Sequence, residues 1–110
     1  MNWTDEFQGA ITVCDCDGIV VYMNDLSEKQ FAKSDDGDLL GKSLIDCHPE
    51  PARTMVKKML AQPTLNSYTI EKNGIRKMIH QTPWIEESEF KGVVEISFVI
   101  PMDLPHHKRD

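Results

Sequence analysis

The spacing of apolar residues changes along this chain, and each spacing predicts a different element. Near the N-terminus two short apolar runs, residues 10–14 and 19–23, flank the sequence Asp-Cys-Asp-Gly at 15–18. An Asp-Gly pair between apolar runs is a strong hairpin signal, because glycine readily takes the positive φ that such turns need. We therefore predict two antiparallel strands, with the Asp15 side chain bonded to the backbone of the turn.

The middle of the chain has the periodicity of a helix. Its apolar residues recur at intervals of three and four positions, which places them in one stripe. These residues are Ala52, Met55, Val56, Met59 and Leu60. Pro51 fits the first turn and Pro63 stops the helix, so we predict a helix over residues 51–61. A weaker pattern predicts a second helix over residues 26–33, with Asn24 as a capping residue.

Shorter helical elements are predicted elsewhere in the first half of the chain. Trp3 and Phe7 lie four residues apart, so a short amphipathic helix within residues 1–8 would place both rings on one face. Residues 38–46 predict one or two helical turns. The residues expected to reach the core from this segment are Leu40, Leu44 and Ile45.

From residue 66 onward the apolar residues alternate, which is the period of a strand. We predict strands over residues 67–72, 75–84 and 93–100. Asn-Gly at 73–74 is a typical two-residue hairpin turn. The acidic segment at 86–89 is predicted to be a loop.

Alternation also divides the side chains of these strands between the two faces of a sheet. In the strand over 75–84, Ile79 and Gln81 share one face, while Met78 and His80 share the other. In the last strand, one face carries Val93, Glu95 and Ser97, and the other carries Val94, Ile96 and Phe98.

The elements come in the order helix, two strands, short helices, one long helix and three strands. Strands at both ends of a chain with helices between them favour a single antiparallel sheet. We predict an α+β fold with one five-stranded antiparallel sheet and helices packed on one face. Residues 1–8 would form a helical cap, residues 9–101 the domain and residues 102–110 a polar tail.

Composition and charge exclude several classes of partner. The 110 residues carry a formal net charge of −6, whereas nucleic acid and anionic membranes need clustered Lys and Arg. We therefore expect neither as a partner. No apolar run is long enough for a signal peptide or a membrane span. Three cysteines, an odd number, fit a reducing cytosol better than a disulfide framework, so we expect a cytoplasmic protein.

Several short motifs in this chain resemble those of PAS domains, a family of small α+β sensory modules. The turn at 15–18 followed by Asn24 resembles the first PAS hairpin. Gly-Lys-Ser-Leu at 41–44 resembles the G-[KR]-x-[LV] sequence ahead of the long connecting helix. Asn-Gly at 73–74 and Gly-x-x-Glu at 92–95 resemble the final three strands. The order and spacing of these motifs extend the resemblance over nearly the whole chain.

A narrower resemblance concerns two four-residue motifs. Asp-Cys-His-Pro at 46–49 and Gln-Thr-Pro-Trp at 81–84 are similar to a subgroup of small bacterial PAS proteins. PAS domains usually act on a fused kinase or cyclase domain, and this sequence contains none. We therefore expect a stand-alone bacterial module without enzymatic activity, which acts through a homodimer or a signalling protein partner.

The resemblance implies a pocket between the inner face of the sheet and the central helices. Some PAS domains bind haem, flavin or a small metabolite there, and others are empty and act by pairing. Our first hypothesis is a small-molecule ligand between the helix over 51–61 and the sheet, with His48 and His80 as polar contacts. The predicted pocket residues are Leu44, His48, Met55, Met59, Tyr68, Met78, His80 and Val94.

The alternative hypothesis is a ligand-free domain for protein–protein interaction. The same apolar positions would then fill the core. The outer sheet face and a surface formed by Trp3 and Phe7 would pair two chains. A pocket with converging polar groups would favour the first hypothesis. A filled core with an exposed apolar patch would favour the second.

Histidine and cysteine chemistry is a further possibility near the central helix. His48 is a candidate haem ligand, and the structural alternative is that it packs at the start of the helix and bonds a backbone group. Flavin-binding photosensors of this family use a reactive cysteine that forms an adduct with the flavin. The residue aligned with that cysteine is Leu44, so only non-covalent flavin binding remains as a hypothesis. The three cysteines and His48 lack the spacing of a zinc site. Cys47 beside His48 is the only hint of a reactive thiol, and we expect no catalysis from it.

Overall fold

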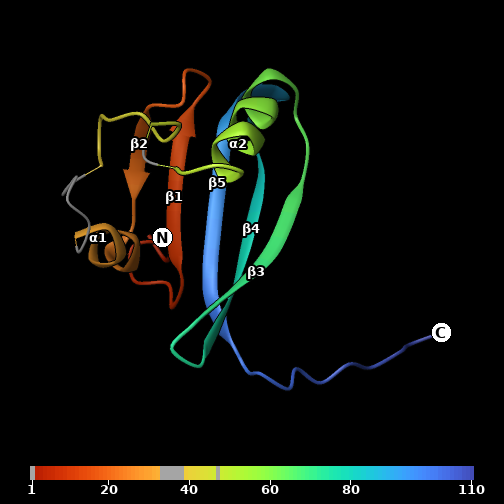
Figure 1. Ribbon diagram of the computed structural model, residues 1–110. Coiled ribbons are helices and arrows are strands. Elements are labelled where there is room, and N and C mark those ends of the chain that lie inside the picture. The colour runs from red at the N-terminus through yellow and green to blue at the C-terminus, as the bar shows by residue number, and fades with distance from the viewer. Residues whose placement is uncertain (1, 33–38, 47) are drawn as a thin grey trace.

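The sheet has five antiparallel strands in the order β2-β1-β5-β4-β3, as Figure 1 shows. The strands are β1 (Ala10–Asp15), β2 (Val20–Met23), β3 (Asn66–Lys72), β4 (Ile75–Glu86) and β5 (Glu89–Ile100). The helices are α1 (Asp25–Ala32) and α2 (Ala52–Ala61). This computed structural model describes residues 2–32, 39–46 and 48–110. The predicted α+β fold with one antiparallel sheet is confirmed.

Both helices lie against the same face of the sheet, called here the inner face (Figure 1). Ser27 of α1 bonds Thr12 of β1 across this face, with 2.6 Å between the hydroxyl oxygens. Met59 of α2 belongs to a buried apolar cluster with Cys14 of β1 and Val93 of β5. The other members of the cluster are Val20, Met23, Leu39 and Leu44. The main core therefore lies between α2, the segment that precedes it and one half of the sheet.

The first hairpin forms as its sequence predicts. Asp15 Oδ1 accepts hydrogen bonds from the backbone N–H of Asp17 at 2.9 Å and of Ile19 at 3.0 Å. Gly18 has a φ of 81°, in the left-handed region that glycine enters without steric cost. The turn is therefore closed by local chemistry before any tertiary contact is needed.

Asn24 joins three segments at the end of this hairpin. Its side-chain oxygen accepts hydrogen bonds from Ile11 N–H at 2.9 Å and from Ser27 N–H at 3.0 Å. Its side-chain amide donates to the carbonyl oxygens of Thr4 at 2.9 Å and Gly9 at 2.8 Å. Asn24 is only 1% exposed. The predicted cap of α1 is confirmed, and the same side chain also holds β1 and the N-terminal segment.

The N-terminal segment forms turns in place of the predicted helix. The first turn is closed by a backbone bond of 3.2 Å from Asp5 N–H to Asn2 O. A helix as short as this one has too few internal bonds to be stable alone. Its Thr4 carbonyl accepts hydrogen bonds from Phe7 N–H at 3.4 Å and from the Asn24 side chain at 2.9 Å.

Two further predictions differ from the structure. The acidic segment is a two-residue turn, since Glu87 and Ser88 have φ of 51° and 65° and the strands on both sides extend to it. Strand pairing thus continues through residues whose composition favours a loop. Leu40 is 52% exposed, whereas Leu39 is 2% exposed and occupies the core position. The segment ahead of α2 forms turns and not a regular helix, so helical spacing did not identify the buried leucine.

All residues beyond β5 are exposed. Residues 102–110 form no helix or strand. In the described parts of the chain, neither helix is long and apolar enough to cross a membrane.

Candidate functional site

A row of polar side chains crosses the middle of the inner face. Asn66, Gln81, Glu95 and Thr12 are direct cross-strand neighbours, one each on β3, β4, β5 and β1. Neighbours of this kind share one face of a sheet. Gln81 and Thr12 are each 2% exposed, and Glu95 is 8% exposed. We call these four residues the polar row.

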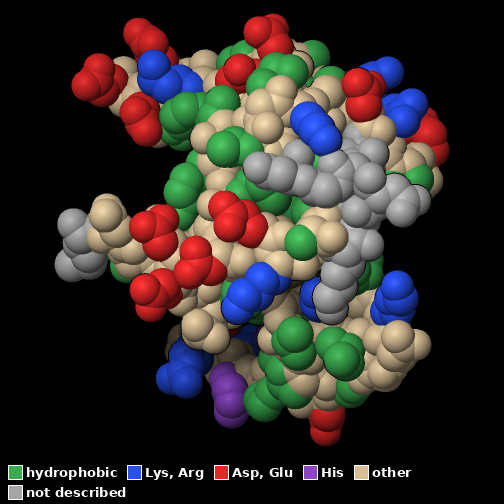
Figure 2. Space-filling model, turned by 90° about the vertical axis from the view of Figure 1, so that its left-hand side faces the viewer, with side chains coloured by type: hydrophobic (Ala, Val, Ile, Leu, Met, Phe, Trp, Pro, Cys, Tyr) green, Lys and Arg blue, Asp and Glu red, His purple; other side chains and the backbone are tan. Residues whose placement is uncertain are grey.

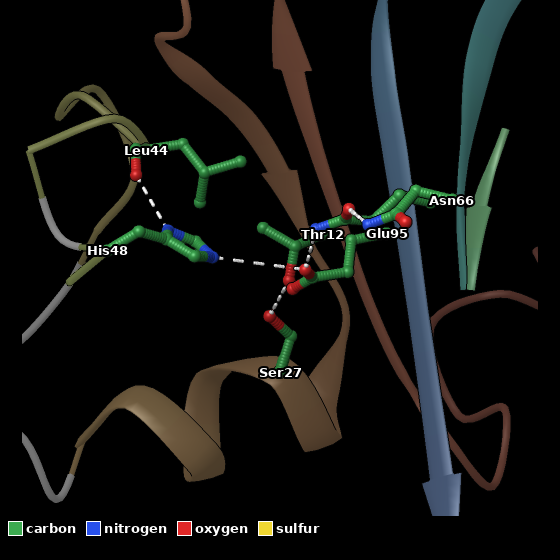
Figure 3. Close-up of polar contacts among 7 residues, drawn as sticks. Thr12, Ser27, Leu44, His48, Asn66 and Glu95 are labelled. Carbon is green, nitrogen blue, oxygen red and sulfur yellow. Dashed lines mark hydrogen bonds and ion pairs between the residues drawn. The ribbon is translucent and has the colours of Figure 1, made fainter. Parts of the chain in front are cut away.

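Hydrogen bonds join the polar row, as Figure 3 shows for several of its members. Asn66 Nδ2 donates to Gln81 Oε1 at 2.9 Å, and Gln81 Nε2 donates to Glu95 Oε1 at 2.7 Å. Thr12 bonds Ser27 of α1. In the described parts of the chain, every buried side-chain nitrogen or oxygen has a hydrogen-bond partner. The row is therefore satisfied within the protein and rigidifies the inner face.

His48 reaches Glu95 from the segment that precedes α2 (Figure 3). Its Nδ1 lies 2.8 Å from the Leu44 carbonyl oxygen, and this nitrogen carries the hydrogen because a carbonyl only accepts. Its Nε2 faces Glu95 Oε1 at 3.9 Å. Protonation of the imidazole would turn this contact into an ion pair between side chains that are 12% and 10% exposed. The backbone hydrogen bond predicted for His48 is confirmed.

Tyr68 lies on the inner face of β3, two residues beyond Asn66. Burial, the larger cause, and the nearby Glu95 carboxylate raise the pKa of the Tyr68 hydroxyl above its ordinary value. The hydroxyl therefore stays protonated at neutral pH and can donate a hydrogen bond.

Beyond the polar row the inner face is open and forms a groove of about 900 Å³. We call it the α1 groove, because it lies between α1 and the hairpin of β3 and β4. From the helix it is lined by Leu26, Lys29, Gln30 and Ala32, and from the inner face of the strands by Ala10, Ile70, Lys72, Ile75, Lys77, Ser97 and Val99. Figure 2 faces the α1 side and shows hydrophobic side chains beside Lys and Arg side chains at the lower end of the molecule. The volume of the α1 groove falls within the range of small-molecule sites.

The eight predicted pocket residues do not meet in one place. Leu44 and Met59 are each 1% exposed and fill the core. Met78, His80 and Val94 lie on the outer face, because they alternate along β4 and β5 with residues of the inner face. This differs from the prediction that they face the helices. On the outer face His80 Nδ1 lies 2.6 Å from the hydroxyl of its cross-strand neighbour Ser67.

The remaining three predicted residues lie on the helix side of the sheet. His48 contacts the polar row, Met55 is half-buried on α2, and Tyr68 is 36% exposed on the inner face. None of the eight predicted residues lines the α1 groove.

Sequence reasoning did not identify the residues of the α1 groove. Alternation placed Lys77 on the same face as Ile79 and Gln81, but that face was not recognised as the one the helices cover. Both faces of β4 carry a similar mixture of apolar and polar residues, so the local pattern could not choose between them. Lys29 carried no separate signal, because an exposed lysine on a helix is ordinary.

Known proteins resemble this chain in structure and not detectably in sequence. No family model matches it, and no curated protein matches it. The PAS domain of the histidine kinase ThkA superposes with a TM-score of 0.63 at 19% identity, over 82% of this chain and 97% of that one. The PAS domain of BvgS from Bordetella pertussis gives 0.64 at 22% identity, over 88% of this chain and 80% of that one. The fold is that of a PAS domain. At these identities the likeness establishes the fold alone.

A third PAS structure, the Aer2 receptor from Vibrio cholerae, is described as a dual PAS-haem oxygen sensor. It has a TM-score of 0.60 and 18% identity, over 84% of this chain and 95% of that one. Haem needs an axial ligand such as His, Cys, Met or Tyr that faces an open cavity. No residue of these types is among the described residues that line the α1 groove, and both ring nitrogens of His48 face groups of the protein. The described residues of this chain therefore do not fit haem in the α1 groove.

The two described cysteines have different surroundings. Cys14 is buried in the core and Cys16 is exposed in the first turn. Cys47, the thiol considered beside His48, lies outside the described residues. Within the described parts of the chain, no three His, Cys, Asp or Glu side chains gather as metal ligands would.

Alkaline pH is expected to destabilise this domain through Cys14. Burial, the largest cause, raises the pKa of the Cys14 thiol from 9.0 to about 11. The native state therefore favours the protonated thiol, and this contribution to stability is complete below pH 9 and lost as the pH rises to about 11. Urea unfolding between these pH values should show a falling free energy of unfolding, by up to about 2 kcal/mol from this group. The fall should be smaller in Cys14→Ala, and equal slopes in both proteins would contradict the assignment.

Proposed function

We propose that this protein is a PAS sensory module that binds a small molecule in the α1 groove. Occupancy would be passed on through a homodimer or a signalling protein partner. As part of the same proposal, the module is cytoplasmic, bacterial and without enzymatic activity of its own. Its Cys-His-Pro step would place it in the subgroup of small stand-alone PAS proteins.

The groove itself is the observation that carries this proposal. It is a hollow of about 900 Å³ on the inner face of the sheet, where the helices leave the strands uncovered. The rigid polar row lies beside it, and Tyr68 supplies a protonated hydroxyl on the same face. We propose Tyr68, His48 and Met55 as contacts for a ligand that extends from the groove toward α2. Leu44 and Met59 support them from the core.

A bulky side chain in the groove should block binding. Ala32 is the last residue of α1 and lines the groove, whereas Ala61 is the last residue of α2 and does not. Both are exposed, so neither substitution should disturb the core. Nile red, a neutral apolar dye, should bind the unmodified protein saturably. We expect Ala32→Trp to weaken this binding about tenfold and Ala61→Trp to leave it within about twofold, a difference typical of a filled apolar site.

Fluorescence titration of the three proteins measures this effect. The absence of saturable dye binding, or an equal loss in both variants, would contradict a binding site in the α1 groove.

The second candidate function is pairing, and an exposed aromatic pair favours it. The rings of Trp3 and Phe7 meet edge to face with centroids 5.6 Å apart. They are nevertheless 57% and 37% exposed. The Tyr22 hydroxyl on the outer face of β2 donates to Asp5 Oδ1 at 2.6 Å, which holds this turn against the sheet. A fixed aromatic surface of this kind is typical of an interface.

If this surface pairs two chains, its removal should yield monomers. We expect sedimentation equilibrium of the unmodified protein to give a dimer. The variant Trp3→Ser/Phe7→Ser should dissociate at least about tenfold more readily, as expected for loss of aromatic anchors. Ile85→Ser removes a side chain that is 56% exposed near the end of β4 and serves as the control. A dimer of unchanged affinity in the Trp3/Phe7 variant would exclude this surface.

A further inference from the structure

Charge among the described residues that line the α1 groove has one sign only. Three of these residues are lysines, namely Lys29 of α1, Lys72 of β3 and Lys77 of β4, and none of the described lining residues is Asp or Glu. The sequence as a whole has 18 acidic residues against 12 Lys and Arg. Among the described residues, none of the ion pairs involves these three lysines. The groove is thus a cationic site on an anionic protein.

The hairpin of β3 and β4 separates its charges by face. On its outer face Glu71 Oε1 and Arg76 Nη2 lie 3.4 Å apart and neutralise each other. On its inner face Lys72 is the cross-strand neighbour of Ile75, and Ile70 is the neighbour of Lys77. Each lysine on the groove side therefore stands beside an isoleucine and opposite no acid.

The floor of the groove exposes aliphatic side chains that a folded protein usually buries. Ile70, Ile75 and Val99 are 47%, 52% and 63% exposed. A ligand with a hydrocarbon part would remove this surface from water, which is favourable in proportion to the area covered. Neutral apolar ligands would make no use of the three ammonium groups, and small inorganic anions would leave the aliphatic floor wet.

We propose that the α1 groove binds an organic carboxylate with an aliphatic tail. The carboxylate would lie among Lys29, Lys72 and Lys77, which bind it as point charges, and the tail would cover Ile70, Ile75 and Val99. This inference rests on the proposed function of the groove as a ligand site and names the chemical class of the ligand.

Competition against Nile red tests the inference with two ligands that differ only in their head group. Decanoate and decanol are each titrated below the concentration at which they aggregate. Decanoate should displace the dye at least about tenfold more effectively than decanol. Raising the salt concentration from 0.05 to about 0.5 M should weaken the binding of decanoate and not that of decanol, because salt screens exposed charges.

Matched charge variants locate the effect. Lys72→Gln/Lys77→Gln should raise the Kd of decanoate about tenfold and change that of decanol less than about twofold. Lys57→Gln/Lys58→Gln alters the net charge equally on the exposed face of α2 and should change neither Kd by more than about twofold. Lys29→Gln, on α1, should also raise the Kd of decanoate. This result would exclude the explanation that the double substitution acts only by altering the hairpin of β3 and β4.

The outcomes separate this inference from the proposed function. If decanoate and decanol compete equally, or if the Lys57/Lys58 variant behaves like the Lys72/Lys77 variant, the carboxylate inference is overturned while the groove remains a ligand site. If Nile red itself does not bind saturably, and neither ligand binds by calorimetry, both proposals fail.

Discussion

Replacement of Gly92 by alanine is expected to remove a large part of the stability of this fold. Gly92 lies in β5, the central strand of the sheet, between Asp15 of β1 and Trp84 of β4. An alanine Cβ at this position would lie 1.9 Å from the carbonyl oxygen of Cys14 and 2.9 Å from the Cα of Asp15. Both are backbone atoms and cannot rotate away. The cost is about 3 kcal/mol or more, the upper range for overpacking, against a total stability of roughly 5–15 kcal/mol for a domain.

Urea unfolding followed by circular dichroism measures the loss, with Gly74→Ala as the control. Gly74 also has a positive φ, of 77°, but a Cβ there meets no atom within 4 Å. Gly74→Ala should therefore cost only the left-handed strain of about 1 kcal/mol. An equal loss of stability in both variants would mean that backbone strain, and not the close contact with β1, is the reason why glycine is needed at position 92.

The second large effect is expected at Asn24, where alanine should lower the free energy of unfolding by about 3–4 kcal/mol. The substitution removes the acceptor for Ile11 N–H and Ser27 N–H and the donor to Thr4 O and Gly9 O. These four backbone groups would lose their side-chain partner at a buried position, because Asn24 is only 1% exposed. Unpaired buried groups retain their desolvation cost, so the loss exceeds that of one helix cap.

Asn2→Ala is the matched control for this prediction, because Asn2 is exposed. It should change the free energy of unfolding by less than about 0.5 kcal/mol, as surface substitutions usually do. Hydrogen exchange adds a positional test, since Asn24→Ala should increase exchange at Ile11 and Ser27 first. A loss limited to about 1 kcal/mol would mean that Asn24 acts only as the cap of α1.

The polar row and the α1 groove differ in what they offer a ligand. The row has paired its own hydrogen-bonding groups, so a polar ligand gains there only by displacing an existing partner. The groove leaves Ile70, Ile75 and Val99 exposed to water, together with two of its three lysines, while Lys77 is half-buried. Charge-changing substitutions in the groove should therefore alter ligand affinity more than stability, whereas substitutions in the row should do the opposite.

Local rules in the sequence alone determined most of the elements of this protein. The Asp15–Gly18 turn carries its own hydrogen bonds and its own positive φ. The stripe of α2 follows helical spacing, with Val56 and Met59 each 1% exposed. Alternation along β5 correctly grouped Glu95 with Val93 and Ser97. Each of these features depends on residues within a few positions of one another, which is the range that propensity and periodicity cover.

Only the tertiary structure decided which face of the sheet the helices cover and where the open groove lies. Alternation along β4 separates Ile79 from Met78 but is symmetric between the two faces, since each carries apolar and polar residues. The polar row depends on the register of four strands, of which β1 is far in the sequence from the other three. The three lysines of the groove come from α1 and from both strands of a distant hairpin. Their convergence is a property of packing, because no local pattern records which segments will face one another across a core.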